Sequence, residues 1–222
     1  MVIKIFIWGM ILAPLAIILE LLLIWLLNPT TYPLSLLREM PQDGFIRIIL
    51  AATLVPALVE EYLKYSVVKL KVLKHSEFDE PIDAMLYCII AGLGFAAIEN
   101  LLVIFKVSSP DLAETLSTIG FRFVGATLVH ALASGIVGYW LALGILYTKH
   151  RKKLISIGLL IAIFIHSCYN YLIITAFDQI SVNKEIMLLS ITAVLLITSA
   201  LLVSLYFRKL KKQQAICKIN EQ

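Results

Sequence analysis

Two adjacent carboxylates and an ammonium group interrupt one of the most apolar stretches of the chain. Glu60, Glu61 and Lys64 lie in the run 45–68, which is otherwise almost free of charge. An ionisable group at membrane depth is unfavourable by ~2.5–3.5 kcal/mol on insertion scales. A helix with three of them must turn them into a bundle interior or a water-filled cavity. A carboxylate in such a place can take a proton from water, which is a step in hydrolysis.

Polar side chains in other apolar runs could meet this pair inside a bundle. They are Glu99, Asn100, His130, His166 and Asn170. A neutral imidazole can orient a water molecule or bind a metal ion, and two histidines with a glutamate match the ligands of a hydrolytic zinc site. The zinc-protease motif HExxH is absent. GxSxG is also absent, which leaves Ser134 a weak candidate for a nucleophile.

The composition is that of a membrane protein. Of 222 residues, 60% are hydrophobic and 15% are charged, and the mean hydropathy is +0.92. A soluble globular domain has about 25% charged residues. The net charge of +4 does not indicate nucleic-acid binding, because the basic residues cluster in short loops and the C-terminal tail. The three cysteines form no CxxC pair, so neither a disulfide framework nor a zinc ribbon is indicated.

Six apolar runs are long enough to cross a bilayer as α-helices. We therefore expect an all-α fold: one integral membrane domain over 1–222, a bundle of about six transmembrane helices with a polar active-site cavity inside. The catalytic helices lie between about 45 and 177. Pro56 is expected to kink the second helix, because it removes a backbone hydrogen bond. Glu20 is expected to face the bundle or the interface rather than take part in catalysis. The expected helices span about 5–27, 45–68, 82–107, 119–147, 154–177 and 186–207, with a polar loop at 108–117.

The basic residues predict how the chain is oriented in the membrane. Lysine- and arginine-rich segments follow the second, fourth and sixth expected helices, at 69–75, 149–153 and 208–212. Basic loops stay on the cytoplasmic side of a membrane. Both termini are therefore expected in the cytoplasm, with 208–222 as a basic cytoplasmic tail.

Five motifs follow one another along the chain: EExxK at 60–64, FDEPID at 78–83, GFAxxEN at 94–100, His130, and HxxxN at 166–170. This ordered series resembles that of the PrsW family of intramembrane proteases, which is similar to the CAAX prenyl endopeptidase and bacteriocin-processing group. The resemblance extends from about residue 50 to 175 and implies a protease of the bacterial plasma membrane. Its substrate would be a membrane-anchored protein, for example an anti-sigma factor.

The resemblance also implies a catalytic role for five residues. Glu60 and Glu61 would be the essential carboxylates, one of them the general base that activates water. Glu99 would line the same cavity, and His130 and His166 would bind the water or a metal ion. Glu99, His130 and His166 are therefore the candidate metal ligands, with zinc as the candidate metal. A glutamate-base mechanism does not strictly require that metal.

Three further residues would support the site. Lys64 would orient a carboxylate, Asn170 would help to stabilise the oxyanion, and Asn100 is a further supporting candidate.

Other functions stay open. An ion-coupled transporter could use the same buried groups as a proton relay, although the sequence has no internal repeat. A haem-binding electron carrier would use His130 and His166 as axial ligands. A non-enzymatic scaffold would not account for the buried charges.

Overall fold

The computed structural model describes residues 1–27, 50–106, 112–177 and 181–212, and the regular secondary structure in these ranges is helical. This confirms the predicted all-α fold. A π-helical segment, η2 (Leu50–Leu54), precedes the second α-helix, and a 3-10 turn, η3 (Thr148–His150), precedes the fifth. The α-helices are α1 (Val2–Leu27), α3 (Val55–Lys71), α4 (Pro81–Lys106), α5 (Leu112–Leu146), α6 (Arg151–Phe177) and α7 (Val182–Leu210).

Among the described residues, five helices are long and apolar enough to cross a membrane: α1, α4, α5, α6 and α7. The sixth, α3, has 17 residues and carries the predicted charges. Residues 45–49 of the expected second helix lie outside the described residues. Pro56 lies in the first turn of α3, where its missing N–H is tolerated. Instead of a kink inside one helix, the structure has a change from π-helix to α-helix just before Pro56.

The predicted loop at 108–117 is wrong for its second half, because α5 already begins at Leu112. Alanine, leucine and glutamate favour helix, and they fill the first positions of α5. At ~1.5 Å per residue a helix of this length exceeds a ~30 Å hydrocarbon layer. The polar start of α5 can therefore extend beyond the membrane without leaving the helix.

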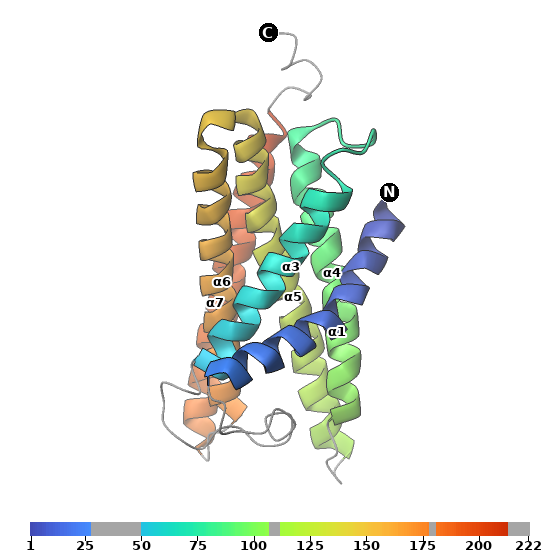
Figure 1. The fold of residues 1–222 in the computed structure, drawn as a ribbon. Helices are drawn as coiled ribbons and strands as arrows, with labels where there is room; N and C mark the ends of the chain where they lie inside the picture. Colours follow the sequence, from blue (N-terminus) through green and yellow to red (C-terminus); the bar gives the residue numbers. More distant parts are fainter. Residues whose placement is uncertain (28–49, 107–111, 178–180, 213–222) are drawn as a thin grey trace.

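Helix α1 crosses the bundle obliquely and α3 is also tilted, whereas α4 to α7 run along the bundle (Figure 1). Helix α1 packs against α4 and α3. Two glycines make the crossing with α4 close: a Cβ atom at Gly9 would overlap the carbonyl oxygen of Ala91, and one at Gly94 would overlap that of Phe6. Small residues at such crossings let membrane helices approach each other closely. This contact fixes the direction in which the second half of α1 runs.

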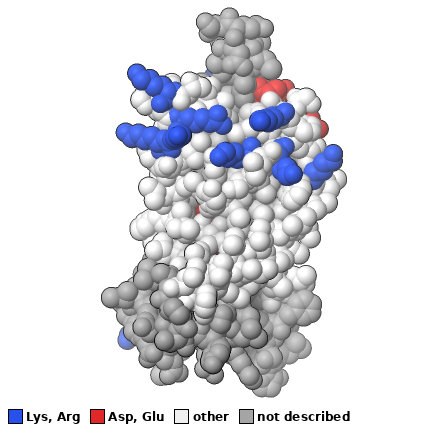
Figure 2. Space-filling model, viewed as in Figure 1, with Lys and Arg blue, Asp and Glu red and all other residues white. Residues whose placement is uncertain are grey.

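The start of α1, the turn between α3 and α4, the turn between α5 and α6, and the end of α7 lie together (Figure 1). Figure 2 shows lysine and arginine side chains gathered at this end of the molecule. We name it the basic end; its basic segments are 69–75, 149–153 and 208–212. The Met1 ammonium donates to Glu77 Oε2 over 2.8 Å there. This hydrogen bond lowers the pKa of the exposed Glu77 carboxyl.

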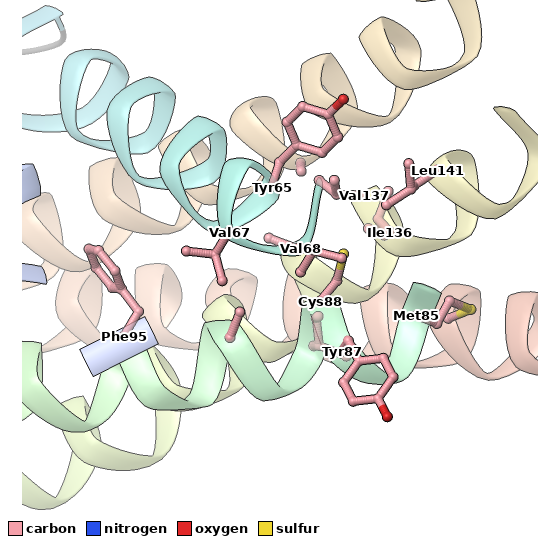
Figure 3. Close-up of a cluster of buried hydrophobic side chains, with 14 of the residues drawn as sticks. Tyr65, Val67, Val68, Met85, Tyr87, Cys88, Phe95, Ile136, Val137 and Leu141 are labelled. Carbon is pink, nitrogen blue, oxygen red and sulfur yellow. The ribbon is translucent and has the colours of Figure 1, made fainter. Parts of the chain in front are cut away.

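Buried apolar side chains from α3, α4 and α5 pack together between the charged residues of α3 and the basic end. Figure 3 shows this group, which we name the inner apolar cluster. Because α3 and α5 run toward the basic end and α4 runs away from it, these positions follow Lys64 and His130 and precede Glu99. The cluster comprises Tyr65, Val67, Val68, Met85, Tyr87, Cys88, Ile136, Val137 and Leu141.

Candidate active site

Three charged residues in the middle of α3 are buried and joined to one another. Glu60, Glu61 and Lys64 are 6%, 0% and 2% exposed, and side chains three or four apart on a helix can meet. Lys64 Nζ donates to Glu61 Oε1 over 2.5 Å and lies 3.9 Å from Glu60 Oε2. A buried ion pair is tolerated when further hydrogen bonds satisfy its remaining groups. Two other helices supply these bonds.

An imidazole from α5 and one from α6 complete the network. His130 Nδ1 lies 2.9 Å from Lys64 Nζ, and His166 Nδ1 lies 2.8 Å from Glu61 Oε1. The two rings are T-shaped, with centroids 4.9 Å apart. Residues that the sequence identified on three separate helices therefore form one hydrogen-bonded group.

Two carboxylates determine which nitrogen of each imidazole carries its proton. An ammonium can only donate, so His130 Nδ1 accepts from Lys64. Its Nε2 then donates to Glu99 Oε2, 2.5 Å away. In the same way, His166 Nδ1 donates to Glu61, which leaves Nε2 with a free lone pair. The two accepting nitrogens, His130 Nδ1 and His166 Nε2, lie 3.6 and 3.8 Å from Glu60 Oε2.

Glu60, His130 and His166 fit a metal ion. One ligand atom from each lies within 4.8 Å of the others, and Glu60 Oε2 has no hydrogen-bond partner among the described residues. Two histidines and a glutamate hold catalytic zinc in several hydrolases, where the fourth position stays open. Carboxylates on the far nitrogens, as Glu99 and Glu61 provide here, orient such histidines.

This group differs by one residue from the predicted ligands, because Glu60 takes the place of Glu99. Glu99 instead binds the nitrogen of His130 that faces away from Glu60. The position of each residue on the polar face of its own helix predicts that Glu99 and His130 line the same site. It does not predict on which side of the ring the carboxylate lies.

A cavity of about 210 Å³ adjoins Glu60, His130 and His166. Apart from Glu20 of α1 and Glu99 of α4, its other wall residues precede Glu60 on η2 and α3, precede His130 on α5 and follow His166 on α6. Given the directions of these helices, the cavity extends toward the end opposite the basic end, while the inner apolar cluster packs on the other side. These other wall residues are Glu20, Ala52, Pro56, Glu99, Ala126, Val129, Tyr169, Asn170, Ile173 and Ile174.

A family model described as PrsW family intramembrane metalloprotease matches residues 1–202 of the chain. The chain belongs to the PrsW family. The match includes every residue of the buried polar group and of the cavity wall. No solved structure matches the chain.

Curated relatives named Protease PrsW are similar to part of the chain. The relative from Geobacillus kaustophilus is 34% identical over 123 residues, which are 55% of this chain and 52% of the relative. The one from Oceanobacillus iheyensis is 31% identical over 117 residues, 53% of this chain and 51% of the relative. The one from Halalkalibacterium halodurans is 26% identical over 145 residues, 64% of each. The chain thus spans about half the length of the first two relatives.

Glu20 belongs to the cavity wall of this PrsW family member, although it was not among the predicted catalytic residues. It faces the bundle, as expected, and α1 brings it there. Buried positions on α1 recur at helical spacing at Ile5, Gly9, Ala13 and Ala16. Glu20 is the next position on the same face. This continuation of the buried face is the signal in the sequence that could have placed Glu20 at the site.

The supporting candidates take different places. Lys64 holds Glu61, and Asn170 lines the cavity. Asn100 is buried on α4, where its Nδ2 donates to Thr127 Oγ1 of α5 over 3.0 Å. It is not part of the cavity wall, and its bond joins two helices.

Proposed function

We propose that this chain is an intramembrane endopeptidase that hydrolyses a peptide bond of a membrane-anchored protein. The observation that carries the proposal is the convergence of two carboxylate-oriented imidazoles on Glu60 at the wall of a cavity. Of the two adjacent carboxylates, Glu60 lines that cavity, whereas Glu61 binds Lys64 and His166. Glu60 is therefore the carboxylate that can meet a water molecule.

The chemistry follows from these contacts. The Glu60 carboxylate takes a proton from a cavity water, whose oxygen attacks the carbonyl carbon of the scissile bond. The proton then passes to the nitrogen of the leaving amine as the C–N bond breaks. The Asn170 amide in the cavity wall is placed to donate to the oxyanion, as side-chain amides do in acyl transfer.

The family description implies a metal ion, and Glu60, His130 and His166 would hold it. When bound, a zinc-like ion polarises the carbonyl and makes its water more acidic. One oxygen of Glu60 suffices to hold an ion, which leaves its second oxygen for the proton. Glu99 and Glu61 keep the two imidazoles in the tautomers that present their lone pairs.

Two observations favour a peptidase over the alternatives. Many carriers are built from internal repeats, and the sequence has none. A haem would need more space than about 210 Å³, since even ordinary ligand pockets measure ~300–1,000 Å³.

We place the basic end on the cytoplasmic side of a bacterial plasma membrane, following the positive-inside rule. Both ends of the described chain then face the cytoplasm. The cavity extends toward the outer half of the bilayer, so the scissile bond would lie there. Membrane-held regulators such as anti-sigma factors are candidate substrates.

The test compares membranes from cells that produce the wild-type protein or Glu60→Gln. We expect mass spectrometry to find truncated membrane proteins with the wild type and not with the variant. Glu185→Gln, at the start of α7 and outside the site, is the matched control and keeps the wild-type products. The same truncated proteins with Glu60→Gln would overturn the proposal.

A further inference from the structure

Lys64 competes with a metal ion for one atom. Its ammonium donates to His130 Nδ1, 2.9 Å away, and that nitrogen is one of the three atoms that converge on the candidate metal position. A single lone pair has one partner at a time. An ammonium next to a divalent cation is also repelled by it. The Lys64 side chain must therefore leave His130 when an ion binds there.

Two further acceptors border the same narrow gap as Lys64. The gap is lined by Glu61, Lys64 and Ser134, together with Tyr65, Cys88 and Val137, and it is too small for a water molecule. The Lys64 side chain, which is itself part of the wall, would reach these acceptors only by moving within it. Glu61 Oε2 and Ser134 Oγ are both buried and have no hydrogen-bond partner among the described residues. Buried polar atoms without a partner are rare. Both are acceptors, and both lie at the gap that Lys64 borders.

We propose that Lys64 has two positions, and that Ser134 and Glu61 form the second. In the metal-free protein the ammonium binds Glu61 Oε1 and His130 Nδ1. When an ion binds, the ammonium turns to Ser134 Oγ and Glu61 Oε2, and His130 becomes a ligand. Glu61 partners the ammonium in both positions, so its buried charge stays compensated. This inference rests on the metal site of the proposed function and makes Ser134 a positioning residue.

Ser134→Ala tests the second position, with zinc titrated into metal-free protein in detergent. A hydrogen bond to a charged group is worth about a tenfold change in an equilibrium constant. We expect zinc to bind about tenfold more weakly to Ser134→Ala. The thermal stability of the metal-free variant stays the same or rises, because the lost hydroxyl has no partner in that state. A metal-free variant that is clearly less stable would overturn the proposal.

A double-mutant cycle separates this role from general packing. Lys64→Met removes the competing ammonium, so we expect Ser134→Ala to have no effect on zinc affinity in that background. Equal effects in both backgrounds would overturn the proposal. Ser199→Ala, a buried serine on α7, is the matched control and leaves zinc affinity unchanged. A wild type that binds no zinc would overturn the two-position proposal and its metal site, whereas glutamate-dependent cleavage is judged by the membrane experiment above.

Discussion

Helices α3 and α7 both have polar side chains in apolar surroundings. The hydrogen-bond partners of these side chains differ between the two helices. On α7, hydroxyl groups donate to carbonyl oxygens of the same helix: Thr192 to Leu188, and Ser199 to Leu195. On α3, Glu61 and Lys64 bind imidazoles of α6 and α5. A hydroxyl bonded within its own helix needs no neighbour, whereas a charged side chain in a membrane helix does. Buried charged residues therefore mark a site when their partners lie on other helices.

The largest effect is expected where the network meets the cavity. Glu60→Gln removes the carboxylate that accepts the proton of water, so peptidase activity falls on the order of 10³-fold. Kinetics on a substrate found by the membrane experiment measure it, with helical content as the control for folding. Activity within tenfold of the wild type would show that Glu60 is not the base.

Lys64→Met tests whether the network of α3 is also structural. Removing one partner of a buried ion pair leaves Glu61 with an uncompensated charge, which destabilises a protein by about 3 kcal/mol. Unfolding of the metal-free protein in mixed micelles measures this loss. If the free energy of unfolding changed as little as it does when an exposed residue is substituted, Glu61 would be neutral or hydrated in the folded protein.

Glu99→Gln sharpens the comparison within the site. Glutamine has a similar size and keeps an acceptor for His130 Nε2, but it loses the negative charge. Losing such support for a ligating histidine lowers metal affinity or activity by about tenfold or more. Zinc titration and kinetics test this. An unchanged affinity would place His130 outside the metal site.

Ser199→Ala tests a polar residue of α7, whose hydrogen bond stays within its own helix. Its Oγ bonds to a carbonyl of its own helix, so the change should alter the free energy of unfolding by about 0.5 kcal/mol or less. The micelle unfolding assay used for Lys64→Met gives the value. A loss as large as that of Lys64→Met would refute the distinction between the two helices.

The smallest effect is expected at the exposed ion pair of the basic end. The folded state lowers the pKa of Glu77, so its stabilisation is present above the unfolded pKa and is lost as pH falls through the folded pKa. We expect Glu77→Gln to lower the melting temperature slightly at about pH 7 and to approach the wild type as the pH falls through the folded pKa. A difference that persists in acid would have another cause.

The sequence predicted the helices of the bundle and most of the residues that meet in it. Charge is so unfavourable in apolar helices that Glu60, Glu61, His130 and His166 had to face one another. The spacing of residues along single helices did not predict how the rings turn: the predicted ligand set contains Glu99, whereas the structure brings Glu60 to the two imidazoles.

Glu20 was missed for a related reason. Its place depends on the oblique crossing of α1 over α4, which Gly9 and Gly94 permit. A helix that ran parallel to the others would have placed the same face elsewhere. The π-helical segment before Pro56 was likewise not predicted from the sequence.

The metal content of purified, detergent-solubilised protein tests the central claim most directly. We expect about one zinc ion per wild-type chain and none in a His130→Ala/His166→Ala double variant that keeps its helical content. Equal zinc in both proteins would contradict the assignment of these histidines as ligands. A wild-type protein that takes up no metal, even when zinc is supplied, would contradict the site built around Glu60.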